Sequence, residues 1–141
     1  MPHIRKNSGF TLIEILVVIT ILGILGALVI PKIMDRPNDA RVSATKQQIA
    51  DTVQALNLYK LDSGSYPNSS QGLAALVQKP SSGKIPPNWR PYMDKLPKDA
   101  WGNEMQYRAP GLHGEIDVFS LGADGAAGGD GYNADIGNWM Q

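Results

Sequence analysis

Residues 9–30 read GFTLIEILVVITILGILGALVI, and this stretch decides the fold. Within residues 10–30 the only ionisable side chain is that of Glu14. The run has 21 residues, close to the roughly 20 that a helix needs to cross a hydrocarbon core about 30 Å thick. Two basic residues, Arg5 and Lys6, precede it, which favours a cytoplasmic N-terminus. We therefore expect a helix that spans a membrane in a single pass.

Three interpretations of this segment remain open. A secretory signal peptide fits the basic start, although the apolar core of a signal peptide usually has about 7–15 residues. A plain single-span anchor fits the length but gives Glu14 no role, unless its carboxylate lies near enough to the interface to reach water. A carboxylate within the membrane usually has a partner, and no basic residue between positions 10 and 31 can supply one in the same helix. In the third interpretation the partner comes from another chain.

The start of the run carries a more specific signal. Gly9 followed by FTLIE, after a short basic leader, resembles the class III signal of type IV pilins and pseudopilins. The resemblance implies that a membrane prepilin peptidase cuts between Gly9 and Phe10, removes residues 1–9 as a leader and methylates the new amino group of Phe10. Glu14 matches the acidic fifth residue of the mature chain in that family. Its carboxylate would neutralise the new α-amino group of a neighbouring subunit and so fix the register of a helical fibre.

A second apolar pattern follows the membrane segment. We expect one helix from about Phe10 to Leu61, with a break or fray near Pro31–Pro37; two separate helices remain the alternative. In the first case residues 10–34 form the transmembrane or filament-core half, and residues 35–62 form an amphipathic half. The side chains expected on the buried face recur at steps of three and four: Val42, Thr45, Ile49, Val53, Leu56 and Tyr59.

Residues 63–141 are expected to form a globular domain. Within it, residues 105–109 and 115–121 read as two strands, and PGLHG between them reads as a hairpin connection. His113 in this connection is interpreted as a solvated loop residue. A long N-terminal helix packed on a small antiparallel sheet is an α+β arrangement. It is also the pilin-like fold that the leader implies.

An acidic, glycine-rich segment occupies residues 120–139, with six glycines and three aspartates. Aspartates supply hard oxygen ligands, and Ca²⁺ takes six to eight oxygens in a flexible cage. The spacing lacks two ligands of an EF-hand and has no flanking helices, so an EF-hand is rejected. An irregular calcium site remains, formed by Asp124, one or both of Asp130 and Asp135, and carbonyls such as that of Leu121. The alternative is a solvated loop with aspartates in turn positions.

Further motifs extend the resemblance to nearly the whole chain. SLGADG and ADIGNW, together with YKLDSGSYP, QGLAALV and APGLHG, resemble the major pseudopilin family of the type II secretion system. The resemblance implies calcium in the C-terminal loop, although the division of labour between Asp130 and Asp135 stays open. Ala100 departs from the family, which usually has proline before WGN, and should relax that turn.

The resemblance also implies a function. The chain would be the precursor of a structural subunit of the bacterial inner membrane, with its C-terminal domain in the periplasm. It would polymerise into a pseudopilus that drives export of folded proteins across the outer membrane. The implied partners are further copies of the chain, minor pseudopilins, the inner-membrane assembly platform, the prepilin peptidase and the secretin.

Composition narrows the other function classes. The chain has no cysteine, and neither of its two histidines, His3 and His113, sits in a recognisable catalytic or zinc motif, so we expect no enzyme. Equal numbers of basic and acidic residues, 13 each, argue against a nucleic-acid partner. The alternatives are a type IV pilin for adhesion or uptake, a secreted or anchored enzyme, and a calcium-dependent binding module, for instance for carbohydrate.

Overall fold

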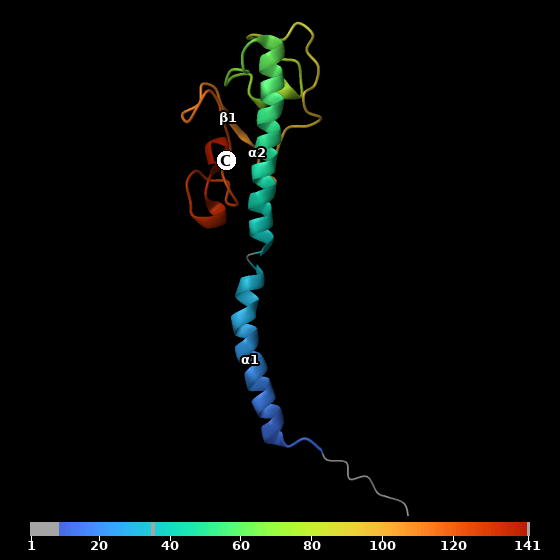
Figure 1. Cartoon of the computed structure of the whole chain (residues 1–141), viewed down its shortest axis with the longest axis vertical. Coiled ribbons are helices and arrows are strands. Elements are labelled where there is room, and N and C mark those ends of the chain that lie inside the picture. Colours follow the sequence, from blue (N-terminus) through green and yellow to red (C-terminus); the bar gives the residue numbers. More distant parts are fainter. Residues whose placement is uncertain (1–8, 35, 141) are drawn as a thin grey trace, which may run out of the picture. The chain divides into compact units, whose positions relative to one another are not determined.

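The structure is a computed structural model that describes residues 9–34 and 36–140. Its elements, in chain order, are the helices α1 (Leu12–Met34), α2 (Arg36–Ser63) and η1 (Leu73–Leu76), strands β1 (Gln106–Arg108) and β2 (Asp117–Ser120), helix η2 (Gly131–Asn133), strand β3 (Ile136–Gly137) and helix η3 (Asn138–Met140) (Figure 1). Met1–Arg36 and Pro37–Gln141 are two compact units. Each is described by itself below.

Helix α1 presents apolar side chains around its whole circumference. The large apolar residues from Leu12 to Leu28 are all exposed, at 46–89% of their accessible surface. Pro31 lies inside the helix, where it removes one backbone hydrogen bond. Judged on length and apolarity together, neither α1 nor any other helix in the described part of the chain is sufficient to cross a membrane. The spanning helix expected from the sequence therefore stays a proposal.

Helix α2 buries one face against the globular domain. Thr45, Ile49, Leu56 and Tyr59 are fully buried, and Val42 and Val53 pack at the edge of the same core. The predicted buried face is therefore confirmed. The helix ends at Ser63 because Gly64 adopts a φ of 81° and donates its N–H to the Lys60 carbonyl over 2.7 Å, a common helix ending.

Asp35 lies outside the described residues. The prediction of one helix from Phe10 to Leu61 therefore stays a prediction, as do the boundaries given for its two halves. Residues 1–8 of the expected leader also lie outside the described residues.

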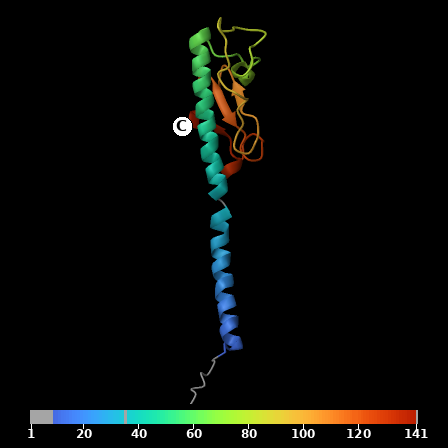
Figure 2. The same ribbon diagram turned by 90° about the vertical axis from the view of Figure 1, so that its right-hand side faces the viewer.

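A three-stranded antiparallel sheet of order β1-β2-β3 lies alongside α2 (Figure 2). Tyr107 pairs with Val118 between β1 and β2, and Ser120 pairs with Ile136 between β2 and β3. The predicted hairpin is confirmed, with shorter strands than expected. The third strand was not predicted, since it has two residues and two residues show no periodicity. The core between the sheet and α2 includes Leu56, Tyr59, Val118 and Ile136.

Candidate functional site

The bond between Gly9 and Phe10 precedes helix α1. Both residues are exposed and outside any regular element, and Phe10 shows 85% of its surface. Exposed segments outside helices and strands are the preferred sites of proteolysis. The predicted cleavage position is therefore open to an enzyme in the free chain.

Glu14 and Thr11 form a reciprocal hydrogen-bonded pair at the start of α1. The Thr11 N–H donates to Glu14 Oε2 over 2.9 Å, and the Glu14 N–H donates to Thr11 Oγ1 over 3.3 Å. This is a capping box, which satisfies two otherwise free backbone donors at a helix N-terminus. The sequence reasoning treated Glu14 only as a buried charge and missed this role, although TLIE has the Thr-x-x-Glu spacing that indicates it.

The C-terminal acidic loop holds the three predicted aspartates. Asp124 and Asp130 are exposed and Asp135 is half-buried. Asp124 Oδ1 accepts the Ala126 N–H, and Asp135 Oδ1 accepts the Gly128 N–H across the loop, each over 3.1 Å. Asp135 thus ties the two sides of the loop together.

The loop folds back tightly on its own backbone. A Cβ atom at Gly122 would lie 2.6 Å from the Asn133 carbonyl oxygen and 2.8 Å from that of Ala134. A Cβ atom at Gly129 would also lie 2.6 Å from the Asn133 oxygen. Both glycines have positive φ, so the close approach and the backbone conformation each require glycine. The result is a compact loop in which carbonyl oxygens lie next to glycine backbone.

The donor chemistry of this loop suits a hard cation. No described residue donates a hydrogen bond to Oδ2 of Asp124, to Oδ2 of Asp135 or to the carboxylate of Asp130. Free carboxylate oxygens and backbone carbonyls are the ligands that Ca²⁺ takes. However, no group of three or more Asp, Glu or His side chains gathers at metal-binding range within residues 9–34 and 36–140. A site here would therefore depend on carbonyls such as that of Leu121 as well as on carboxylates.

A buried carboxylate, Asp99, supports the start of the loop. It is 5% exposed. Its Oδ1 accepts the N–H groups of Trp101 over 3.0 Å and Asn103 over 2.9 Å, and its Oδ2 accepts the Ser120 hydroxyl over 2.6 Å. Ser120 Oγ in turn accepts the Gly122 N–H over 3.0 Å. The sequence analysis predicted no role for Asp99.

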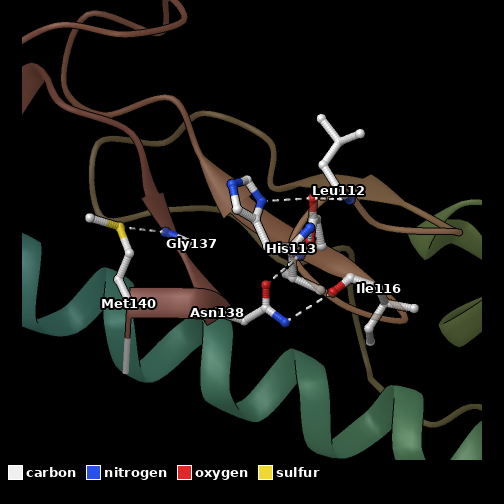
Figure 3. Close-up of polar contacts among 8 residues, drawn as sticks. Leu112, His113, Ile116, Gly137, Asn138 and Met140 are labelled. Atoms are coloured by element: carbon white, nitrogen blue, oxygen red, sulfur yellow. Dashed lines mark hydrogen bonds and ion pairs between the residues drawn. The ribbon is translucent and has the colours of Figure 1, made fainter.

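A second buried carboxylate, Asp117, organises the hairpin connection. It is 2% exposed and accepts the backbone N–H of Leu112 over 2.8 Å and that of His113 over 3.2 Å. The His113 ring lies 3.1 Å from its Oδ2 (Figure 3). Burial raises the pKa of the Asp117 carboxyl, but the hydrogen bonds from Leu112 and His113 outweigh it and hold that pKa below its usual value.

The C-terminal segment is attached to strand β2 through Asn138. Its Oδ1 accepts the Val118 N–H over 3.1 Å, and its Nδ2 donates to the Ile116 carbonyl over 3.2 Å (Figure 3). The amide therefore acts as a further strand-pairing group beyond β3. The ADIGNW motif thus contributes a loop carboxylate, a short strand and this attachment.

Comparisons with known proteins agree with the motifs at both ends of the chain. The family model of type II secretion system protein G matches residues 32–139, and the model of the prokaryotic N-terminal methylation motif matches residues 4–30. Type II secretion system core protein G of Pseudomonas aeruginosa is 55% identical, over 96% of this chain and 96% of the relative. Its counterpart from Vibrio cholerae is 49% identical, over 99% of this chain and 96% of the relative.

A solved structure has the same fold. It is the major pseudopilin from the type 2 secretion system of enterohaemorrhagic Escherichia coli, with 36% sequence identity and a TM-score of 0.67. The match covers 77% of this chain and 94% of that one. The predicted pilin-like α+β fold is therefore confirmed.

Proposed function

This chain belongs to the family of type II secretion system protein G, and from that premise we infer that it is a structural subunit of the type II secretion pseudopilus. One observation carries the inference: the apolar side chains of α1 from Leu12 to Leu28 are all exposed. A helix that is apolar on every side must be covered, by lipid or by other chains. In a subunit that polymerises, copies of the same helix supply that cover.

The family match favours the pseudopilus over an adhesion or uptake pilin. The methylation motif at residues 4–30 is common to pilins and pseudopilins, whereas the protein G model matches residues 32–139. The distinguishing match therefore lies in the globular part of the chain.

We propose that a prepilin peptidase cuts the precursor after Gly9 and methylates Phe10. The exposed, non-helical position of both residues supports this. We further propose that the carboxylate of Glu14 then leaves its hydrogen bond to the Thr11 N–H and neutralises the new α-amino group of an adjacent subunit. Transfer from a local cap to a charged partner would favour assembly, because in a medium of low polarity a carboxylate is stabilised more by a cation than by an uncharged backbone N–H.

The proposed location follows from this processing. The mature chain would be anchored in the bacterial inner membrane by its N-terminal segment, with the globular unit in the periplasm, until it enters the fibre. The partners that we propose for the chain are minor pseudopilins, the inner-membrane assembly platform, the prepilin peptidase and the secretin. The family assignment and the exposed apolar helix support this proposal.

We also propose that the acidic loop binds Ca²⁺. Asp124, Asp130 and Asp135 would supply carboxylate oxygens, and Leu121 a carbonyl oxygen. The ion would neutralise carboxylates in a stretch with few basic residues: from residue 99 to 141 the chain has seven acidic residues and one basic residue, Arg108. Its role would be to order the loop and stabilise the subunit.

N-terminal sequencing tests the processing step. Protein recovered from membranes should begin at Phe10, with a methylated amino group detectable by mass spectrometry. A start after Ala27 would indicate a signal peptide, and a retained Met1 would indicate a plain anchor. Either result would overturn the proposed processing.

A further inference from the structure

The acidic loop begins at the peptide group that joins Leu121 to Gly122, and a buried side chain holds the N–H of this group. Ser120 has no exposed surface, and its Oγ accepts the Gly122 N–H over 3.0 Å. That N–H belongs to the peptide joining Leu121 to Gly122. Because a peptide is planar and trans, its N–H and C=O point in opposite directions. Fixing the Gly122 N–H therefore also fixes the direction of the Leu121 carbonyl.

Asp99 determines how Ser120 makes this bond. The Ser120 hydroxyl donates its proton to Asp99 Oδ2 over 2.6 Å, so its oxygen lone pairs remain available to the Gly122 N–H. Asp99 is itself held by the N–H groups of Trp101 and Asn103. A carboxylate held by several donors is a rigid acceptor. The rotation of the buried hydroxyl is thus set by a group 21 residues away in the sequence.

Asn103 holds the other side of the same glycine. Its backbone N–H bonds to Asp99, and its Nδ2 donates to the Gly122 carbonyl over 3.2 Å. Both backbone polar groups of Gly122 are therefore bonded to side chains of this network. A Cβ atom at Gly125 would lie 3.6 Å from Asn103 Oδ1, so Asn103 also lies beside the loop further along.

We propose that Asp99, Ser120 and Asn103 are positioning residues for the cation loop, and that they aim the Leu121 carbonyl at the ion. This inference rests on the proposed calcium site. Groups that orient metal ligands commonly change metal affinity by about 10–100-fold when they are removed. The network also reaches α2, since the Ala100 N–H donates to the buried Thr45 hydroxyl over 3.1 Å. Binding of the ion in the loop would therefore also affect how residues 98–104 attach to α2.

The experiment compares two buried serines that make the same local bond. Ser63 is buried, and its Oγ accepts the Ser65 N–H, as Ser120 accepts the N–H two residues ahead. Ser63 lies at the end of α2 and outside the network around Gly122. Full-length wild type, Ser120→Ala and Ser63→Ala are purified in detergent, and Ca²⁺ affinity is measured by isothermal titration calorimetry. Melting in chelator reports the purely structural cost of each change.

We expect Ser120→Ala to bind Ca²⁺ at least about tenfold more weakly than wild type, with Ser63→Ala unchanged in affinity. Both variants should lose stability in chelator. With Tb³⁺ in place of Ca²⁺, luminescence lifetimes in H₂O and D₂O count the waters on the ion. Ser120→Ala should show an additional bound water where the carbonyl is lost, and Ser63→Ala should not.

Asn103→Ala is the second variant, for the case that Ser120→Ala does not fold. Asn103 is half-buried, and its loss should weaken Ca²⁺ binding in the same direction. If wild type binds Ca²⁺ and Ser120→Ala or Asn103→Ala binds equally tightly with the same hydration, the positioning inference is wrong and the calcium site stands. If wild type binds no Ca²⁺, the proposed site fails and the inference fails with it.

Discussion

The imidazole ring of His113 lies flat against the indole of Trp139, with ring centroids 3.9 Å apart and planes inclined by 13°. His113 also contacts the buried carboxylate of Asp117. The connection between β1 and β2 is thereby joined to the end of the chain through one side chain. Asn138 and Trp139 both lie directly after strand β3, at the C-terminal side of the acidic loop. Their contacts therefore hold that side of the loop against strand β2 and the hairpin connection.

Asp117→Asn should destabilise the protein by about 1–3 kcal/mol at neutral pH, because the amide presents a donor where a carboxylate accepts several. The pKa of Asp117 is lowered in the folded state. Its stabilising contribution is therefore present above the unfolded pKa of about 3.9 and is lost as pH falls through the lower folded value. Urea unfolding from pH 7 down to pH 3 measures this contribution. Below about pH 4, Asp117→Asn should lose less unfolding free energy per pH unit than wild type does.

The control for that series is Glu115→Gln. Glu115 is exposed and pairs with Lys60 over 2.6 Å, so its removal should cost less than about 1 kcal/mol. If both variants lost the same unfolding free energy, the buried hydrogen bonds of Asp117 would stabilise the fold no more than the exposed ion pair of Glu115 does.

Local patterns predicted most of the fold. The buried face of α2 follows from its three-and-four periodicity, because helix packing repeats that period regardless of the partner. The hairpin of β1 and β2 was predicted from two strand-like segments, residues 105–109 and 115–121, with the turn residues PGLHG between them. The exposed apolar helix α1 was also predictable. Residues 10–30 contain one ionisable side chain, and such an apolar helix must be covered by lipid or by other chains.

Burial of the two carboxylates could not be predicted from the sequence. Asp99 and Asp117 look like members of an acidic stretch, yet their donors come from a serine 21 residues away and from the backbone of a turn. Such burial depends on tertiary contacts that have no period. His113 is exposed, as expected of a solvated loop residue, but its stacking on Trp139 joins positions 26 residues apart. The loop aspartates were identified by composition, but composition does not tell which oxygens face one another.

Glu14→Gln separates the two roles of that side chain. Glutamine can replace glutamate in a capping box, so the start of α1 should keep its helicity, whereas the charge that would meet the new α-amino group is gone. We expect normal membrane levels and helicity by circular dichroism, with loss of pseudopili in sheared fractions and of export. Normal fibres from Glu14→Gln would contradict the charge-neutralisation proposal.

Thr11→Ala is the matched change on the other side of the same pair. It removes the Thr11 Oγ1 acceptor and should cost about 1 kcal/mol of helix stability while leaving the Glu14 charge in place. Fibres should still form. Loss of fibres in Thr11→Ala, with Glu14→Gln normal, would assign the function of this pair to capping instead.

Asp124→Ala should lower the melting temperature in saturating Ca²⁺ and change it little in chelator. A ligand that binds only the folded state stabilises it by an amount that grows with its concentration over Kd, about 2.7 kcal/mol at a hundredfold excess. Calorimetric scans of the full chain in both media give the comparison. Asp94→Ala, an exposed aspartate outside the loop, is the control and should match wild type in both media. Equal losses for Asp124→Ala in both media would show that the carboxylate does not bind the ion.

Two glycines of the loop separate backbone conformation from crowding. Gly128 has a φ of 87°, and no atom beyond its two chain neighbours lies within 4 Å of the position that a Cβ would take, so Gly128→Ala should cost about 1–2 kcal/mol, for the left-handed conformation alone. Gly122 has a φ of 73°, and its Cβ would lie 2.6 Å from the Asn133 carbonyl oxygen. Gly122→Ala should add about 1–3 kcal/mol to that cost, because backbone must move to admit the methyl group. Denaturant unfolding in chelator measures both free energies. Equal values would mean that the 133–134 backbone yields freely and that the loop is not closed tightly before the ion binds.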